Sequence, residues 1–262
     1  MYLWKTLYKL RGHIIKAKKV LIFLDYDGTI VPITSTPQEV KLPKLSRTLL
    51  KNINHQHTIS VGVVSGRSLE ELKNQIHIPG LIYAGNHGLE WEINGKKHRL
   101  RNLSKYLRHL SRVKKILLHL VRDYPGVIIE DKRFTLAIHY RKIDRKLLSS
   151  FRTYLHSLLN PLLGSLPIRL SEGKKIYEIR PATGWTKGDF VEFVINKIVQ
   201  TSSNYLVIYI GDDITDEDVF AKLSNIVSVK VGRGKTEAKY YLTNYQETIL
   251  FLKWVLDTIQ TN

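Results

Sequence analysis

Polar residues that can do chemistry follow four apolar runs of this chain, at the point where each run ends. They are Asp25, Asp27, Ser65, Gly66, Arg67, His87, Asp212 and Asp213. Lys187 precedes the last of these runs. Clustered carboxylates repel one another, and a bound divalent cation keeps them ionised. Oxygen ligands favour Mg²⁺, and a lysine and a hydroxyl beside it suit the oxygens of a phosphoryl group in transfer.

The spacing of Asp25 and Asp27 adds a second kind of chemistry. One carboxylate can attack phosphorus and form an aspartyl-phosphate. The other, two residues further along an extended chain, projects from the same side and can protonate a leaving alcohol. Gly28 lets the chain turn with no side chain in the way. The spacing alone also allows a simple paired acid–base unit.

A parallel sheet would bring these residues together. Short β-rich runs alternate with helical patterns, which favours an α/β fold. The expected strands are residues 20–25, 58–64, 81–85, 205–212 and 226–232, and the expected helices are an N-terminal one within 1–19 and residues 68–76, 187–199, 216–223 and 247–259. Ligands of parallel sheets bind beyond the carboxyl ends of the strands, so the polar residues should converge on one edge.

Residues 101–181 have a different pattern. Two amphipathic helices are expected, one from 103 to 121 and one from 143 until Asn160-Pro161 ends it. Strand-like runs occupy 127–130 and 134–141, and 168–181 forms a hairpin with its turn at Glu172-Gly173. We therefore predict a Rossmann-like parallel-sheet core, residues 1–100 and 182–262, with an inserted smaller α+β cap domain, residues 101–181.

Composition limits the class of protein. The 262 residues are 43 % hydrophobic, enough for a substantial core, and no apolar run approaches the length of a membrane span. The absence of cysteine excludes disulfides, thiolate metal sites and cysteine nucleophiles, and makes the cytoplasm the default compartment. We expect no membrane association.

The net charge of +18 is unevenly distributed, with ten Lys or Arg and no acid between Ile93 and Arg122. Such a surface attracts nucleic acid, acidic lipid or a phosphorylated small molecule, or is a solvated helix face. Aromatic residues are not interleaved with the basic ones, which disfavours nucleic acid.

Several blocks of the sequence resemble a known family. "DYDGT", "VVSGR", the lysine of "TKG" and "GDDITDED" are similar to the motifs of haloacid dehalogenase-like (HAD) phosphohydrolases. "GNHGLE", "EDKRFTLAIHYR", "GKKIYEIRP" and "GDDITDEDVF" resemble the blocks of trehalose-6-phosphate phosphatases, and the similarity spans about residues 20 to 232.

The resemblance implies a Mg²⁺-dependent phosphatase of trehalose biosynthesis that acts on trehalose 6-phosphate through an aspartyl-phosphate. A phosphatase for another sugar phosphate, of the sucrose 6-phosphate or mannosyl-3-phosphoglycerate type, is the close alternative. From a different class, the chain could be a basic anion-binding protein or a regulatory partner of a trehalose-6-phosphate synthase. A synthase is also a possible partner of the active enzyme.

The resemblance also assigns roles to residues. Asp25 is the nucleophile and a metal ligand, and Asp27 is the general acid and later the base, with its backbone carbonyl on the metal. Phosphate-binding residues are Ser65, Gly66 and Lys187, of which Lys187 also offsets the charge of Asp25. The remaining metal residues are Asp212, Asp213 and Asp216. Substrate-binding residues are Arg67, His87, Glu90, Glu130, Lys132, Arg141, Lys174 and Glu178.

An inserted cap suits this chemistry. Attack by Asp25 needs water absent, whereas hydrolysis of the aspartyl-phosphate needs one water admitted, so a cap that closes and opens is useful. Two positions depart from the family pattern. Ile176 stands where a polar residue is common, and Asn86 is not the residue expected within "GNHG".

Overall fold

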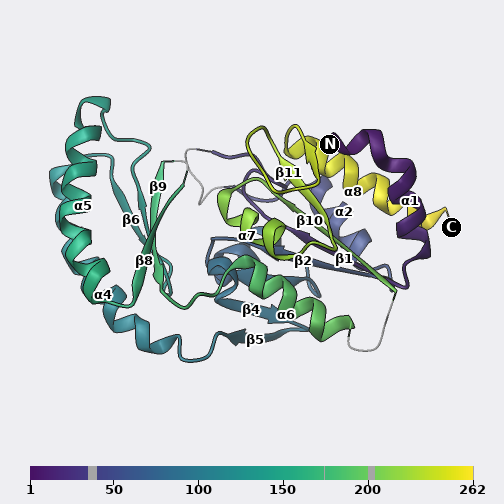
Figure 1. Cartoon of the computed structure of the whole chain (residues 1–262), viewed down its shortest axis with the longest axis horizontal. Helices are drawn as coiled ribbons and strands as arrows, with labels where there is room; N and C mark the ends of the chain where they lie inside the picture. The colour runs from purple at the N-terminus through teal and green to yellow at the C-terminus, as the bar shows by residue number, and fades with distance from the viewer. Residues whose placement is uncertain (35–39, 174, 200–203, 262) are drawn as a thin grey trace. The chain divides into compact units, whose positions relative to one another are not determined.

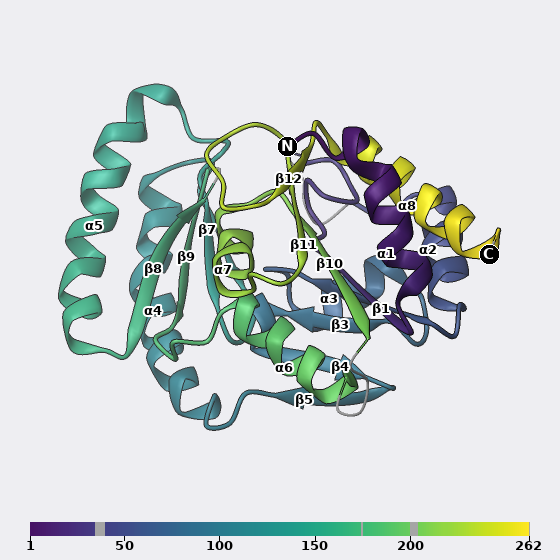
Figure 2. The same cartoon turned by 45° about the vertical axis from the view of Figure 1, so that its right-hand side comes forward.

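The structure is a computed structural model that describes residues 1–34, 40–173, 175–199 and 204–261. The chain divides into two compact units, one formed by Met1–His98 with Trp185–Asn262 and one by Arg99–Gly184. Figures 1 and 2 show the chain in two orientations. The smaller unit is thus inserted into the larger one along the sequence.

The larger unit contains an eight-stranded sheet in the order β12-β11-β10-β1-β2-β3-β4-β5 (Figure 2). Its strands are β1 (Lys19–Leu24), β2 (Ile59–Val64), β3 (Ile82–Gly85), β4 (Glu90–Ile93), β5 (Lys96–Arg99), β10 (Tyr205–Gly211), β11 (Val227–Val231) and β12 (Tyr240–Leu242). The pairs from β12 across to β3 are parallel, and β4 is antiparallel to β3. All five expected strands are present, which confirms the α/β core.

Three strands of this sheet were not expected from the sequence: β4, β5 and β12. β4 alternates charged and apolar residues over only four positions, and all four residues of β5 are exposed. β12 is three residues long. None of these segments has the continuous apolar run that identifies a strand buried on both faces.

Helices cover both faces of the larger sheet. They are η1 (Leu3–Thr6), α1 (Leu7–Lys16), α2 (Lys44–Asn54), α3 (Leu69–Ile76), η3 (Asn86–Gly88), α6 (Lys187–Val199), α7 (Ile214–Lys222) and α8 (Tyr245–Gln260). Val20, Ile22 and Leu24 of β1 share a core with residues of α1, α2, α3 and α8. On the other face, Tyr209 of β10 packs edge-on against Phe220 of α7. The central strand β1 is therefore buried on both faces.

The smaller unit contains a four-stranded antiparallel sheet in the order β6-β7-β9-β8. Its elements are α4 (Ser104–Asp123), β6 (Ile128–Asp131), β7 (Leu136–His139), η4 (Arg145–Leu147), α5 (Leu148–Ser165), β8 (Ile168–Gly173) and β9 (Ile176–Pro181). Leu136, Ile138 and Ile179 lie in one core with the buried stripes of α4 and α5. The side chains that alternate with these residues form the opposite face of the sheet, which is polar.

Two local predictions in the smaller unit were wrong. α5 does not end at Asn160-Pro161 but continues through Pro161 to Ser165, because Leu162 is buried in the core and the hydroxyl of Ser165 donates to the carbonyl of Pro161. The hairpin does not turn at Glu172-Gly173, because the ladder extends to the pair Gly173 and Ile176.

Six of the ten basic residues between Ile93 and Arg122 lie on α4, and the other four precede it, three of them in β5. Tyr106, Leu110, Val113, Leu117 and Leu120 are the buried residues of α4. The exposed basic residues of α4 are Lys105, Arg108, Arg112, Lys115 and Arg122. The part of the charged run on α4 therefore lies on the solvated face of an amphipathic helix. Within the described residues, no helix is both long and apolar enough to cross a membrane.

Candidate active site

Asp25 lies directly after the central strand β1 and is 5 % exposed. Its backbone N–H donates to the carbonyl of Ile210 in β10, so the ladder holds the chain in place up to the carboxylate. Gly28 follows with φ of +82°, and a Cβ there would collide with the carboxylate of Asp212. Glycine is therefore required both for the turn and for the approach of Asp212 to this loop.

Lys187 connects Asp25 to Asp216. It is the first residue of α6 and 1 % exposed, and its Nζ donates to Asp25 Oδ1 and to Asp216 Oδ1, both at 2.8 Å. The hydroxyl of Tyr209 donates to Asp216 Oδ1 at 2.7 Å, and the N–H of Asp213 donates to Asp216 Oδ2 at 2.9 Å. Each charge in this buried cluster has a hydrogen-bonded partner, as burial requires.

The electrostatics of the cluster are unbalanced. Burial raises the pKa of Asp25 well above its usual value, although Lys187 acts in the opposite direction, and Asp216 and Asp212 raise it further. Burial alone would lower the pKa of Lys187, but Asp216 and Asp25 outweigh it and hold this pKa above its ordinary value. A further positive charge beside Asp25 would therefore favour its ionised form.

The residues present fit a divalent cation. Among the described residues, carboxylate oxygens of Asp25, Asp212 and Asp216 lie within 4.8 Å of one another, and all three residues are buried. Three carboxylates against the single ammonium of Lys187 leave two negative charges, which one divalent cation balances. Asp216 already receives hydrogen bonds from Lys187, Tyr209 and Asp213, so it supports the cluster, while Asp25 and Asp212 are the better candidate ligands.

Asp213 has a structural role at the start of α7. It is the N-cap residue, and it forms a reciprocal capping box with Asp216. The two aspartates thereby accept hydrogen bonds from backbone amides of the first turn. Their negative charges at the N-terminus also stabilise the helix through its dipole. Asp213 and Asp216 thus hold the loop that carries Asp212 in place.

Asp27 is 35 % exposed and pairs with Arg67, which is 5 % exposed. Arg67 Nε and Nη2 each donate to one oxygen of Asp27, both at 2.7 Å. Arg67 Nη1 donates to Glu71 of α3, and the guanidinium lies over the ring of Tyr26. Arg67 was expected to bind substrate, and in the structure its guanidinium is bonded to Asp27 and Glu71.

Ser65 and Gly66 lie in the turn between β2 and α3. Ser65 is 2 % exposed, and its Oγ accepts the N–H of Arg67 at 3.2 Å. A Cβ at Gly66 would lie 2.8 Å from Cε1 of His87, so glycine lets the imidazole pack against this turn. His87 is itself 7 % exposed, with φ of 59°. The turn after β2 therefore packs against His87 of η3, which follows β3.

Glu90 supports this turn from the start of β4. Its Oε1 accepts the N–H of Leu69 at 2.9 Å, at the beginning of α3, and the side-chain amide of Asn86 at 2.8 Å. This also gives Asn86, the unexpected residue of "GNHG", a structural role. Glu90 thus stabilises the turn through these two hydrogen bonds.

The expected sugar-binding residues of the smaller unit lie mainly on its polar sheet face. The register aligns Glu130 of β6, Ala137 of β7 and Glu178 of β9 in one row. Small Ala137 stands between the two glutamates. Glu130 Oε2 lies 2.7 Å from Nε2 of His139.

Lys132 and Glu178 form the other polar group of this face. Lys132 Nζ and Thr135 Oγ1 both lie 3.5 Å from Glu178 Oε1. Arg141 follows β7 and is exposed, and Lys174 lies outside the described residues. The structure therefore brings Glu130, Lys132 and Glu178 to one face.

Sequence reasoning missed Arg180 and Thr135, which accompany Glu178. Arg180 is 8 % exposed, and its Nε lies 3.6 Å from Glu178 Oε2. Arg169 of β8 is the direct cross-strand neighbour of Arg180. Strand alternation could have identified Arg180, because it is two residues from Glu178 and shares its face.

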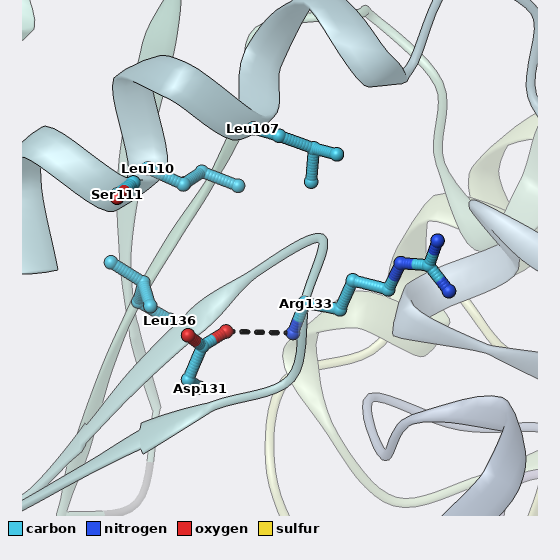
Figure 3. A pocket seen from close by; sticks show the side chains of 6 residues that line it. All are labelled: Leu107, Leu110, Ser111, Asp131, Arg133 and Leu136. Atoms are coloured by element: carbon cyan, nitrogen blue, oxygen red, sulfur yellow. Dashed lines mark hydrogen bonds between the residues drawn. The ribbon is translucent and has the colours of Figure 1, made fainter.

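A separate pocket lies between α4 and the β6–β7 hairpin, with a volume of about 400 Å³ (Figure 3). Its lining residues are Leu107, Leu110, Ser111, Asp131, Arg133 and Leu136. Asp131 is the neighbour of Glu130 in β6, so it lies on the opposite face of the strand. It accepts the N–H of Arg133 at 2.8 Å. This pocket is thus distinct from the polar sheet face.

The mainly parallel sheet, with the buried aspartate and lysine cluster beyond its central strand, gives this chain a HAD-like fold. A haloacid dehalogenase-like hydrolase from Bacteroides thetaiotaomicron has the same fold, with a TM-score of 0.59 at 17 % identity over 91 % of this chain and 100 % of that one. The family model of the trehalose-phosphatases matches residues 23–246. The chain belongs to the trehalose-phosphatase family and is a phosphatase of that family.

Individual relatives agree with this assignment. The chain is 32 % identical over 258 residues to "Probable trehalose-phosphate phosphatase D" of Arabidopsis thaliana, covering 92 % of this chain and 68 % of the relative. Among solved structures, a "trehalose-6-phosphate phosphatase related protein" has a TM-score of 0.80 at 27 % identity, over 92 % of this chain and 100 % of that one.

The C-terminal domain of a C. albicans trehalose-6-phosphate phosphatase shares the fold, with a TM-score of 0.86 at 21 % identity over 95 % of this chain and 96 % of that one. The family, the fold class and the enzyme class expected from the sequence are thereby confirmed. The chain spans about two thirds of the length of its curated relatives.

Proposed function

We propose that this protein hydrolyses trehalose 6-phosphate to trehalose and phosphate, with Mg²⁺ and through an aspartyl-phosphate on Asp25. The observation that carries the proposal is the buried cluster of Asp25, Lys187 and Asp216 at the end of β1, with Asp212 beside it. The family name supports the substrate class. When bound by Asp25, Asp212 and the backbone carbonyl of Asp27, Mg²⁺ supplies positive charge to the phosphoryl oxygens.

In the first half of the reaction, a carboxylate oxygen of Asp25 attacks phosphorus and the bond from phosphorus to the sugar oxygen breaks. Asp27 gives its proton to the departing sugar oxygen. Ser65, the amide of Gly66 and Lys187 hold the phosphoryl oxygens, and Lys187 offsets the charge that remains on Asp25.

In the second half, Asp27 takes a proton from water while the water oxygen attacks phosphorus. The bond from phosphorus to Asp25 breaks and phosphate leaves, so both aspartates return to their starting states. We propose the smaller unit as the cap domain that excludes water during the first half and admits it for the second.

The polar sheet face of the smaller unit suits a sugar. Glu130, Lys132 and Glu178 offer charged donors and acceptors from one side of the sheet, and charge-assisted hydrogen bonds to hydroxyl groups are among the stronger polar contacts. Arg141 and Lys174 are proposed as further sugar contacts, and His87 as a contact near the phosphate. Arg67 and Glu90 are engaged within the protein and take no part in this binding proposal.

A regulatory role beside a synthase is the second candidate. The "trehalose synthase regulatory protein C-terminal domain" of Candida albicans has a TM-score of 0.75 at 15 % identity, over 94 % of this chain and 97 % of that one, which is a likeness of fold alone. Asp25, Asp27, Lys187 and Asp212 are all present here, which favours catalysis. A synthase as partner and a cytoplasmic location stay predictions.

Phosphate release from a panel of esters tests the proposal. The panel contains trehalose 6-phosphate, sucrose 6-phosphate, glucose 6-phosphate and mannosyl-3-phosphoglycerate, each with Mg²⁺ and with EDTA. We expect release to be fastest from the trehalose ester and to stop in EDTA. Equal rates across the panel would overturn the substrate assignment, and full activity in EDTA would overturn the metal assignment.

A further inference from the structure

The guanidinium of Arg67 is almost completely buried. Two of its nitrogens donate to the two oxygens of Asp27, both at 2.7 Å, and the third donates to Glu71. Its central carbon lies 5.2 Å from the centre of the Tyr26 ring. At 5 % exposure, Arg67 has little surface with which to meet a substrate.

The two hydrogen bonds from Arg67 to Asp27, called the fork below, fix the orientation of the Asp27 carboxylate as well as pairing its charge. Two parallel N–H bonds hold a carboxylate in the plane of the guanidinium, which a lysine ammonium cannot do. A carboxylate has about four lone-pair sites, so a fork leaves one on each oxygen for a proton. Asp27 can therefore be held in place and still exchange a proton.

Arg67 is itself anchored by α3. Glu71, which accepts from Arg67 Nη1, also accepts from the side-chain amide of Gln75 at 3.2 Å. The backbone N–H of Arg67 donates to Ser65 Oγ at 3.2 Å. One turn therefore fixes both the hydroxyl proposed to bind phosphate and the guanidinium that holds Asp27.

We propose that Arg67 is a positioning residue that holds Asp27 in one orientation for both proton transfers, with Glu71 and Tyr26 fixing Arg67 in turn. The inference rests on the proposed function, because it takes Asp27 as the general acid and base. It assigns Arg67 a task other than substrate binding. Since each proton transfer is sensitive to the orientation of Asp27, both halves of the reaction depend on the fork.

A double-mutant cycle between Arg67→Lys and Asp27→Asn tests the inference. With trehalose 6-phosphate, we expect Arg67→Lys to lower kcat by about a hundredfold and to leave KM within about threefold, because the fork is lost and substrate contacts are kept. In the Asp27→Asn background, the same substitution should cause no further loss. An equal loss in both backgrounds, or a loss mainly in KM, would overturn the proposal.

The leaving group provides a readout that a general structural defect would not reproduce. The phenolate of p-nitrophenyl phosphate departs without a proton, so rapid-quench measurements on Arg67→Lys should show formation of the aspartyl-phosphate within about threefold of wild type. Hydrolysis of that intermediate should slow by about the same factor as kcat on the sugar ester. Equal slowing of both steps would contradict a role through Asp27.

Arg47→Lys is the matched control. Arg47 Nη2 donates to the carbonyls of Leu42 and Gln75, and none of the hydrogen bonds identified for it reaches Asp27. This variant should retain the wild-type rate of both steps. A loss equal to that of Arg67→Lys would show that the effect is not specific to the fork.

If Arg67→Lys does not fold, Glu71→Gln is the alternative variant for testing the role of Arg67. It keeps the fork and loosens only its anchor, so kcat should fall by about tenfold, and again only when Asp27 is present. An effect that persists in Asp27→Asn would contradict the proposal. If the wild-type enzyme is inactive on trehalose 6-phosphate, the proposed function is overturned but the role of Arg67 is not. The double-mutant cycle can then still be measured with p-nitrophenyl phosphate.

Discussion

The two polar regions of the molecule are constructed differently. In the cluster at the end of β1, the side chains of Lys187, Asp25 and Asp216 are 1 %, 7 % and 0 % exposed, and both ion pairs measure 2.8 Å. On the polar face of the smaller unit, Lys132 and Arg180 approach Glu178 only to 3.5 Å and 3.6 Å. The contacts around Lys187 are short and closed, whereas these two contacts of Glu178 are longer, although Glu130 on the same face lies 2.7 Å from His139.

This difference matches the two tasks that we propose for the regions. Groups that stabilise charge in a transition state work best when they are already fixed, because no reorganisation is then needed during the reaction. Groups that bind a sugar can exchange long bonds to one another for shorter bonds to hydroxyl groups. Changes in the cluster should therefore affect both stability and turnover, and changes on the sheet face should affect mainly binding.

Replacement of Lys187 by methionine should have the largest effect. It leaves Asp25 and Asp216 buried without their shared cation, and breaking a buried pair in this way costs about 3–5 kcal/mol. We expect the free energy of unfolding in EDTA, measured by urea denaturation, to fall by that amount, and phosphatase activity to be lost. An unchanged urea midpoint would show that the cluster is not a closed unit.

Replacement of Glu130 by glutamine should separate binding from stability. Glu130 and its partner His139 are 22 % and 20 % exposed, so the free energy of unfolding should change by less than about 1 kcal/mol. The KM for trehalose 6-phosphate should rise by about tenfold, since charged hydrogen bonds contribute about 1.5–3 kcal/mol. Steady-state kinetics and urea denaturation of the same preparation measure both quantities. A large loss of stability with an unchanged KM would show that Glu130 has a structural role and not a role in binding.

Burial in the larger unit should also affect stability at alkaline pH, through Tyr83 of β3. Burial raises the pKa of Tyr83 to about 12, against an ordinary value of 10.0. The folded state then keeps the phenolic proton where the unfolded chain loses it, so this stability is complete below pH 10 and declines as pH rises through about 12. Tyr83→Phe should show a shallower decline of stability between these values, and an identical slope would contradict the assignment.

The smallest effect is expected at an exposed pair of the smaller unit. Lys114 and Asp131 are 40 % and 39 % exposed and 2.8 Å apart. An exposed pair contributes about 0–1 kcal/mol, so Lys114→Ala should leave the free energy of unfolding nearly unchanged. The short distance makes this a control, because a large loss would show that distance matters more than burial in this protein.

The sequence predicted the parts of the molecule that depend on continuous patterns. The apolar runs of β1, β2, β3, β10 and β11 identify strands buried on both faces, and the polar residues after them share one edge by topology alone. β5 was missed because its four residues are all exposed and its pairing comes from the sheet beside it. α5 passes Pro161 because tertiary packing of Leu162 overrides a local signal.

The candidate site was predictable in its residue types but not in its pairings. Tyr209 looks like a core aromatic in an apolar strand, and only the structure shows its hydroxyl on Asp216. The fork between Arg67 and Asp27 joins residues 40 positions apart, and its direction depends on rotamers that no local pattern encodes. The sequence therefore favoured substrate binding for Arg67, although its position in the fold favours a role through Asp27.

In the proposed mechanism, Asp25 carries the phosphoryl group during turnover. Rapid acid quench during turnover, followed by peptide mass spectrometry, tests it most directly, with Asp25→Asn as the control. We expect the peptide that contains Asp25 to gain the mass of one phosphoryl group in the wild type and not in the variant. Phosphate on another residue, or an Asp25→Asn variant that keeps more than about a tenth of the activity, would contradict covalent catalysis by Asp25.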